Sequence, residues 1–384
     1  MRRGLPALLL AAMGAAAHAG DVIVLADGRT IGTPKAADPP EPADFAASNL
    51  TITDEQVDGV AYRLAGVPAR QTLPRAQVRA VFHDPALVPA DLSEGVALIG
   101  RGRFDEGRNR LSSVTRNSAA PPWSQCEAAY RRAESFAIAG DVEGAVRGLA
   151  AFAQERPKSR YVLDAKRLRA RLLWDLGRDS EAKSEHESIA QVAGVSDDEA
   201  LAARFLAAWI DARPALRSDD AKSAADAAKA FDEIAGKAAA GGPLAQRCAV
   251  ARSACLAAQG RADESLAALV ASSGDPFVLA VGNTLLADAL RRRAGEKADR
   301  AVLEEAQERY LRVVLLYREA DGASDYVAAA WFHAAELFME LKPPDEAGAA
   351  EARARARREW EDLARRYPRS EWGKRAKAAA AALQ

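Results

Sequence analysis

The chain has 384 residues, of which 49% are hydrophobic and 28% are charged, and its formal net charge is −1. This composition is ordinary for a globular protein, and the length allows two or three domains. The nearly neutral balance argues against nucleic acid as a partner, because nucleic-acid binding rewards a strongly basic face.

Residues 1–19 have the pattern of a secretory signal peptide. Arg2 and Arg3 precede a short apolar run that ends in Ala17-His18-Ala19, a small-residue cleavage pattern. The alternative is an uncleaved anchor, but the run is shorter than the roughly 20 residues that span a bilayer. No later stretch is apolar for long enough to cross a membrane. We therefore expect a secreted or periplasmic protein whose formal net charge after cleavage is −3.

Residues 20–85 alternate apolar and polar side chains between turn signals, which is typical of β-strands. Val22 and Val24 share one face before a turn at Asp27-Gly28, and further strands are expected in NLTITD, GVAYRLAG and AQVRAVF. The segment KAADPPEPADFAAS between them is a predicted polar loop. About five short strands favour a small closed barrel, because closure removes exposed edges. The segments DVIVLADGRTIG and LPRAQVRAVF resemble parts of the SH3-like or Sm-like barrels that precede helical repeats in some bacterial envelope proteins.

Residues 86–384 change to the periodicity of helices, interrupted by recurring glycine-centred turns. The segments GRFDEG, GDVEGA, GRDSEA and GRADES begin at Gly102, Gly140, Gly177 and Gly260. They are spaced at roughly 40 residues or twice that, a period typical of a solenoid whose helix pairs bury their apolar faces against their neighbours.

The unit around Gly140 shows the layout of one helix pair. Ala133 and Phe136 share one face before the turn, and Leu149 and Phe152 share one face after it. Together with Ala145, these residues resemble the tetratricopeptide repeat (TPR), which implies an α-solenoid of antiparallel helix pairs. Two units depart from the pattern, since Gly107 and Ser265 stand where the small alanine is expected.

A second pattern marks the junctions between repeats: proline, serine, an aromatic residue and alanine at fixed spacing. The proline ends one helix, the serine caps the next, and the aromatic residue and the alanine begin its buried stripe. This joint resembles those of periplasmic TPR proteins that serve outer-membrane assembly and the Tol–Pal system. Its two full copies are Pro157-Ser159-Tyr161-Ala165 and Pro368-Ser370-Trp372-Ala376, and a partial copy has Ser324, Tyr326 and Ala330.

Signals for chemistry are weak, and we predict no catalytic residue, metal ligand or cofactor. His83, His186 and His333 are isolated in sequence, and His186 is expected on an exposed helical face. Neither a zinc-binding pair of histidines nor a phosphate-binding loop is present. The doubled aspartates 197–198 and 219–220 suit helix N-termini, with a calcium site as the alternative.

The three cysteines are too few for a disulfide framework. Cys248 and Cys255 lie about 10 Å apart along one helix, which is beyond disulfide reach. We expect these two and Cys126 to be small buried apolar residues.

The TPR resemblance implies a concave groove, lined by the first helix of each pair, in which partner proteins lie as extended peptides or helices. Arg167 and Arg171, one turn apart, are predicted to hold a carboxylate or an acidic segment. The residues expected to face this groove are Glu127, Tyr130, Glu134, Asp164, Arg167, Arg171 and Trp174.

The predicted function is therefore a non-enzymatic scaffold that holds other proteins or peptides of the cell envelope. Two alternatives stay open. One is an envelope enzyme, such as a hydrolase, whose site carries no recognisable motif. The other is a cell-wall glycan binder that uses exposed aromatic side chains of the barrel, for which Tyr62 is the candidate.

Overall fold

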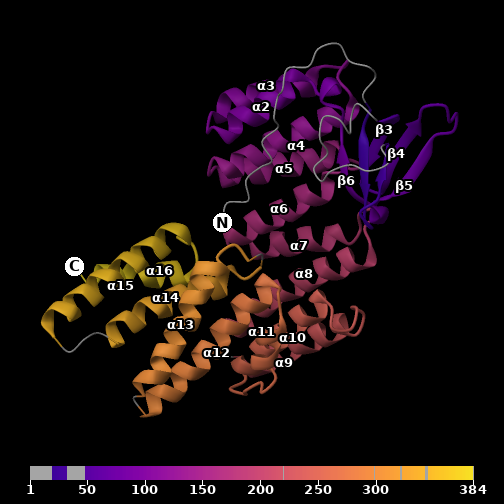
Figure 1. Ribbon diagram of the computed structural model, residues 1–384. Coiled ribbons are helices and arrows are strands. Elements are labelled where there is room, and N and C mark those ends of the chain that lie inside the picture. The colour runs from indigo at the N-terminus through magenta and orange to yellow at the C-terminus, as the bar shows by residue number, and fades with distance from the viewer. Residues whose placement is uncertain are drawn as a thin grey trace. The chain divides into compact units, whose positions relative to one another are not determined.

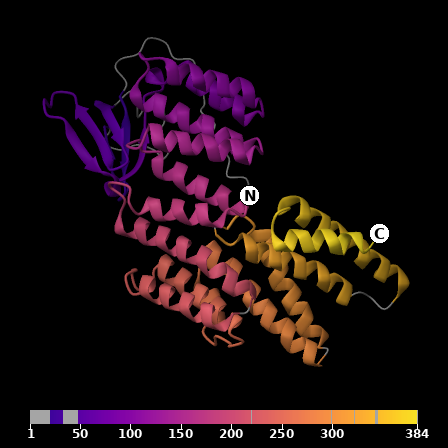
Figure 2. The same ribbon diagram turned by 180° about the vertical axis from the view of Figure 1, so that it is seen from behind.

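The computed structural model describes residues 20–32, 48–218, 220–297, 299–320, 322–341 and 345–383. The predicted signal peptide and most of the predicted loop KAADPPEPADFAAS lie outside these residues. The chain divides into two compact units, shown in Figures 1 and 2. The N-terminal unit comprises Met1–Arg169 and Gln191–Ser196, and the C-terminal unit comprises Ala170–Ala190 and Asp197–Gln384.

The N-terminal unit begins with two antiparallel three-stranded sheets. In one sheet the order is β2-β1-β6, and in the other it is β3-β4-β5. The strands are β1 (Val22–Leu25), β2 (Thr30–Ile31), β3 (Leu50–Gln56), β4 (Gly59–Leu64), β5 (Gln71–Pro74) and β6 (Val78–Phe82).

The prediction of a closed barrel is wrong, because these two sheets stay open. A 3-10 turn at Arg75–Gln77 separates β5 from β6, and the two strands pair in different sheets. Asp21, which precedes β1, forms an isolated bridge with Leu50 of β3 and not a continuous ladder. The sheets instead share an apolar core in which Ile23 of one packs with residues such as Ile52 of the other.

Fifteen helices among the described residues follow the strands. Those of the N-terminal unit are α2 (Ala90–Gly100), α3 (Phe104–Arg116), α4 (Pro122–Ile138) and α5 (Val142–Glu155). The boundary between the units falls within α6 (Val162–Asp175). Those of the C-terminal unit are α7 (Asp179–Ile189), α8 (Asp197–Ser218), α9 (Ala221–Ala235), α10 (Pro243–Ala258), α11 (Leu266–Ser272), α12 (Pro276–Lys297), α13 (Arg300–Leu316), α14 (Ser324–Glu340), α15 (Glu346–Arg366) and α16 (Glu371–Ala381).

Within each unit, consecutive helices pack side by side as antiparallel pairs (Figure 1). Helices two apart in the chain also pack together where their numbers are even: α2 contacts α4, and α8, α10, α12, α14 and α16 contact one another in succession. Helices on the inner side of a helical stack lie closest together, so we assign α2 and α4 to the inner layer of the N-terminal unit and α8, α10, α12, α14 and α16 to that of the C-terminal unit. The helix packing within each unit confirms the predicted stacking of antiparallel helix pairs.

The four recurring glycines end helices in the same way, as predicted. Gly102, Gly140, Gly177 and Gly260 have φ values of 78°, 84°, 72° and 70°, in the left-handed region that glycine adopts without strain. After each, the next residue donates its backbone N–H to a carbonyl five residues earlier, as Asp141 does to Phe136 at 2.8 Å. This pair of features is the Schellman motif, and it satisfies carbonyls that the helix end leaves open.

The departure at Gly107 also has a structural reason. A Cβ atom at this position would lie 2.8 Å from the backbone oxygen of Gly95 and 2.7 Å from the side chain of Ile99. Helices α2 and α3 therefore approach one another more closely than alanine allows.

The junction pattern performs its predicted role at its second copy. The Ser370 hydroxyl accepts a hydrogen bond from the Gly373 N–H at 2.9 Å and so caps α16. Trp372 is partly buried, with its ring centroid 5.4 Å from that of Phe332. At the first copy, Ser159 accepts from the Tyr161 N–H at 3.3 Å and also pairs with Gln56 of β3, so this junction joins the helices to the sheet.

Candidate functional site

All seven residues predicted to face a groove lie on even-numbered helices. Three are in α4. Tyr130 is buried and stacks on Tyr161 with a centroid distance of 5.2 Å, and its hydroxyl lies 3.2 Å from a carboxylate oxygen of Glu134. Arg131 lies 2.9 Å from Glu134 and 3.6 Å from Glu127, so these partly buried carboxylates already have an internal partner. Glu127, Arg131 and Glu134 thus form a row of charged side chains on α4, beside the stacked rings of Tyr130 and Tyr161.

The other four predicted residues lie in α6 and divide between the two units. Asp164 and Arg167 belong to the N-terminal unit, where their side chains form an ion pair at 3.8 Å. Arg171 and Trp174 belong to the C-terminal unit, where both line the same pocket. In the structure, then, Arg167 faces a carboxylate of its own helix, whereas Arg171 lies at a cavity.

A pocket of about 70 Å³ lies within the C-terminal unit. It is formed by the ends of α6, by α7 and α8, and by the segments that precede α14 and α16. Its lining includes Arg171, Trp174, His186, Arg318, Arg366 and Tyr367. We call it the arginine pocket, because three of these side chains carry a guanidinium group.

The arginines of this pocket differ in how far their charge is compensated. Arg366 forms an ion pair with Glu319, which also lines the pocket. The guanidinium of Arg318 donates to the Val314 carbonyl at 3.4 Å and lies over the ring of Trp331. Arg171 is exposed and forms no ion pair with a carboxylate of the described residues. Among the described residues that line the pocket, three guanidinium groups thus stand against the two carboxylates of Asp175 and Glu319.

Trp174 is the most deeply buried aromatic side chain predicted for the groove, with 6% of its surface exposed. Its indole Nε1–H has no hydrogen-bond acceptor within the part of the chain that the structure describes. The guanidinium of Arg213 lies 4.6 Å from the centroid of the indole ring and holds it in place. A buried N–H without an acceptor is uncommon in native proteins.

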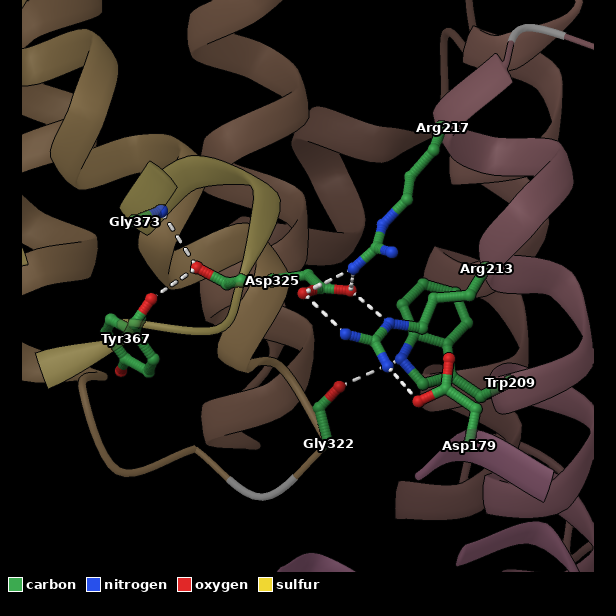
Figure 3. A network of polar contacts seen from close by, with 9 residues as sticks. Asp179, Trp209, Arg213, Arg217, Gly322, Asp325, Tyr367 and Gly373 are labelled. Atoms are coloured by element: carbon green, nitrogen blue, oxygen red, sulfur yellow. Dashed lines mark hydrogen bonds and ion pairs between the residues drawn. The ribbon is translucent and has the colours of Figure 1, made fainter. Parts of the chain in front are cut away.

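Arg213 is also the centre of a network that the sequence did not predict (Figure 3). It donates to Asp325 at the start of α14 and to Asp179 at the start of α7, the latter at 2.6 Å. Arg217, one turn later on α8, adds a hydrogen bond to Asp325 at 3.0 Å. We call this the arginine cluster, and it joins segments 112 residues apart in sequence.

An aromatic group packs beside the arginine cluster. The Trp209 indole donates to the Gly322 carbonyl at 2.8 Å, and its ring lies 5.2 Å from that of Phe277 and 5.7 Å from that of Tyr326. The chain itself therefore fills the space between α8 and the start of α14, and the arginine pocket lies beside this filled region because Gly322 contributes to both.

The N-terminal unit contains a second buried charged network, the histidine cluster. Nδ1 of His83 lies 3.3 Å from Asp21, Nε2 faces Glu55, and Glu55 also pairs with Arg160. The imidazole stacks on Trp123 of α4 at 3.6 Å. Burial alone would lower the pKa of His83, but its hydrogen bonds to Asp21 and Glu55 raise it above the ordinary value. With a carboxylate at each ring nitrogen, the cluster is neutral when the imidazole is protonated.

Two sequence-based interpretations need correction. His186 is buried, not exposed, because it lies on the same helical stripe as Ala182 and Ile189, four and three residues away. Tyr62 is also buried, at 5% exposure, and its hydroxyl donates to Gln71 at 2.6 Å. It packs in the core between the sheets, so the exposed aromatic surface that the glycan-binding alternative requires is not provided by Tyr62.

The other candidates for reactivity or metal binding are the cysteines and the doubled aspartates. Cys248 and Cys255 are buried free thiols whose pKa values burial raises to about 11 and about 12, and Cys126 is partly buried. Asp220 accepts from the backbone of Lys222 and Ser223 at the start of α9, whereas Asp219 is not among the described residues. Within the described residues, no group of three or more His, Cys, Asp or Glu side chains is arranged to hold a metal ion, and no helix has the length and apolar character of a membrane span.

Comparison with known proteins adds a similarity to a solved structure. No family model and no curated protein matches the chain. A crystal structure of the TPR domain of P58(IPK) matches with 16% sequence identity and a TM-score of 0.27, over 76% of this chain and 97% of that one. At this TM-score the two chains do not superpose as wholes, so the fold assignment rests on the helix packing described above.

Proposed function

We propose that this protein is a TPR-like scaffold that binds other proteins along the inner layer of its helices. The observation that carries the proposal is the stacking within each unit: α2 packs on α4 in the N-terminal unit, and α8, α10, α12, α14 and α16 pack on one another in succession in the C-terminal unit. A stack of this kind presents a continuous surface built from many helices, which suits an extended partner better than a small substrate.

The side chains on this layer support the same proposal. In α4, a partly exposed row of charged side chains lies beside the buried Tyr130–Tyr161 stack. Polar and charged groups of this kind form the rim of protein interfaces. Because the surface is already ordered, binding costs less conformational entropy than folding around a partner would.

The proposed location is the bacterial envelope, either the periplasm or the exterior. This part of the proposal rests on the leader-like pattern of residues 1–19 and on the junction pattern of the repeats. Other envelope proteins or their peptides are then the expected partners.

The proposal assigns the arginine pocket to binding, and not to hydrolysis. A hydrolase needs a nucleophile next to a general base, or an acid and a base on either side of a bond. The pocket presents three guanidinium groups, which orient and stabilise anions, and its lining also includes His186 and Ser324. We propose recognition because arginine is the most frequent residue of this lining.

Site-specific photocrosslinking in cells tests the scaffold function. A benzoyl-phenylalanine is placed at Asp164, which is exposed on the even-numbered helix α6, and as a control at Arg147, which is exposed on the odd-numbered helix α5. We expect discrete crosslinked proteins at position 164 and few at position 147. Equal crosslinking at the two positions, or none at position 164, would argue against the inner layer as the binding surface.

A further inference from the structure

We propose that the open edge of β5 binds an extended segment of a protein partner as an added strand, with a lysine or arginine side chain of that segment in the groove beside β5. The site lies wholly in the N-terminal unit, on one of its two sheets. It is therefore a second binding surface, separate from the inner layer of helices.

One side of β5 has no strand beside it. β5 is the last strand of the sheet β3-β4-β5 (Figure 1), and within the described residues no strand pairs with its other side. At the end of the β4–β5 ladder, the Arg75 N–H donates to the Asp58 carbonyl at 2.9 Å. Bonded and non-bonded pairs alternate along an antiparallel ladder, so Leu73 bonds to β4 and Thr72 does not. The N–H and C=O of Thr72 therefore point to the open edge.

The length and composition of β5 limit what can add to this edge. The strand has four residues, Gln71–Pro74, and Pro74 has no N–H to donate. Short strands and prolines protect sheet edges from open-ended aggregation. The N–H and C=O of Thr72 and the C=O of Pro74 stay available, which is enough for a short added strand. Because these backbone bonds are few, we expect side chains to supply much of the affinity.

A groove of about 490 Å³ lies on the sheet face beside the open edge, and Thr72 and Pro74 line it. Its floor is the central strand β4, where Gly59 and Ala61 leave room that larger side chains would fill. A Cβ on Gly59 would lie 2.3 Å from the Leu73 carbonyl oxygen, so glycine is required there. An added strand presents alternate side chains to each face of the sheet. The side chain opposite Thr72 therefore enters this groove.

The charges of the groove favour a basic side chain at that position. Asp54 already accepts a hydrogen bond from Gln56 at 2.7 Å and pairs with Arg70 at 3.3 Å. The carboxylate of Asp58, in the turn between β3 and β4, has no ion pair among the described residues. Of the charged side chains that line the groove, two are carboxylates and one is a guanidinium. A lysine or arginine brings both the missing positive charge and N–H donors.

Two other occupants match these features less well. A neutral oligosaccharide has no backbone that pairs with Thr72 and no charge for Asp58. A second copy of the chain, paired edge to edge through β5, would bring two copies of the same groove together and supply a cation to neither Asp58. A segment of another protein meets both requirements.

Amide NMR of the full chain tests the added strand. Threonine is labelled with ¹⁵N, and the Thr72→Val variant assigns the Thr72 signal. The probe is a capped peptide in which serine and valine alternate around a central lysine. We expect it to move the Thr72 signal downfield and to slow its hydrogen exchange, because this amide gains an acceptor. N-methylation of the lysine amide should weaken binding by about tenfold or more, since the peptide then cannot donate to the Thr72 carbonyl.

The groove is tested by changing the charge on each side of the contact. A peptide with glutamine in place of the lysine should bind about tenfold more weakly, the size of one charged hydrogen bond. Asp58→Asn should weaken binding of the lysine peptide by the same factor and leave the glutamine peptide unchanged. Asp27→Asn is the matched control, because Asp27 lies in the exposed turn between β1 and β2 and does not line the groove. It should bind both peptides as the wild type does.

Four results would overturn the proposal: a Thr72 signal that the lysine peptide does not move, equal binding of the N-methylated peptide, equal binding of the lysine and glutamine peptides, or an unchanged affinity in Asp58→Asn. A Thr72 signal that moves with protein concentration alone would assign the edge to a second copy instead. Tighter binding of a neutral oligosaccharide, maltotetraose, than of the lysine peptide would assign the groove to a glycan. Crosslinking at position 164 tests the inner layer of helices and does not decide any of these outcomes.

Discussion

Each unit connects its secondary-structure elements through a buried charged cluster, centred on a histidine in one unit and on an arginine in the other. In the N-terminal unit, the histidine cluster joins the sheets to α4 and to the segment before α6, with His83 between Asp21 and Glu55. In the C-terminal unit, the arginine cluster joins α8 to the starts of α7 and α14. Imidazole changes its charge near neutral pH, and guanidinium does not. The two joints should therefore respond differently to pH.

The largest effect is expected from Arg213→Ala. Arg213 is buried, and its loss leaves the largely buried carboxylate of Asp325 without its main partner, so unfolding free energy should fall by about 3–5 kcal/mol. Urea denaturation of both proteins measures this. Arg217→Ala is the control, because its exposed guanidinium makes a surface contribution of about 1 kcal/mol or less. Equal losses in the two variants would mean that the cluster is not the main joint of this unit.

Next in size is His83→Gln, which removes a buried cation between two carboxylates. We expect a loss of about 2–3 kcal/mol at pH 6, because Glu55 and Asp21 keep their burial but lose a charged partner. Thermal or urea unfolding at fixed pH checks this value. Trp123→Leu should cost less, since it removes the ring stacked on His83 but leaves the charges paired.

The pH dependence separates the two joints most sharply. The pKa of His83 is raised in the folded protein, so its contribution to stability is fully present below the unfolded value of about 6.5 and is lost as pH rises through the folded pKa. Unfolding free energy measured from pH 6 to pH 9 should therefore fall in the wild type and in Arg213→Ala. It should change less in His83→Gln. A fall of the same size in His83→Gln would assign the pH dependence to another group.

A smaller effect is expected at the repeat junction, from Trp372→Ala. The residue is only partly buried, so the loss should be about 2 kcal/mol, less than a fully buried tryptophan would give. The contacts at stake are those with Phe332 and His333. Trp372→Phe, which keeps an aromatic ring, should recover most of the stability. An unchanged melting curve for Trp372→Ala would show that the junction does not depend on this packing.

The smallest effect is expected from Gly140→Ala. A Cβ at this position meets no atom within 4 Å. The free-energy cost therefore comes only from holding a residue other than glycine at a φ of 84°. The expected loss is about 1 kcal/mol. Gly140→Asn should cost less, because asparagine tolerates the left-handed region better than alanine does. A loss far above this in either variant would point to a contact that the turn geometry does not show. If the losses are as small as expected, this turn contributes less to stability than either charged cluster.

The sequence predicted the features that depend on neighbouring residues. The glycines at 102, 140, 177 and 260 predicted helix ends, because few other residues adopt a left-handed backbone conformation without strain. Ser370 predicted a helix start, because its hydroxyl can accept a hydrogen bond from a backbone N–H of the first turn, here that of Gly373. His186, predicted on an exposed face, instead shares the buried stripe of Ala182 and Ile189.

The sequence did not predict features that depend on the path of the whole chain. Alternation of apolar residues indicated strands, but whether β5 pairs with β6 to close a barrel depends on the turn between them and on the core that the two sheets share. Only the tertiary structure brought Asp21, Glu55, His83 and Arg160 together, or joined Arg213 to Asp325 across 112 residues. Local conformation is governed by forces within one turn of the chain, whereas a buried charge is tolerated only where the complete fold supplies its partner.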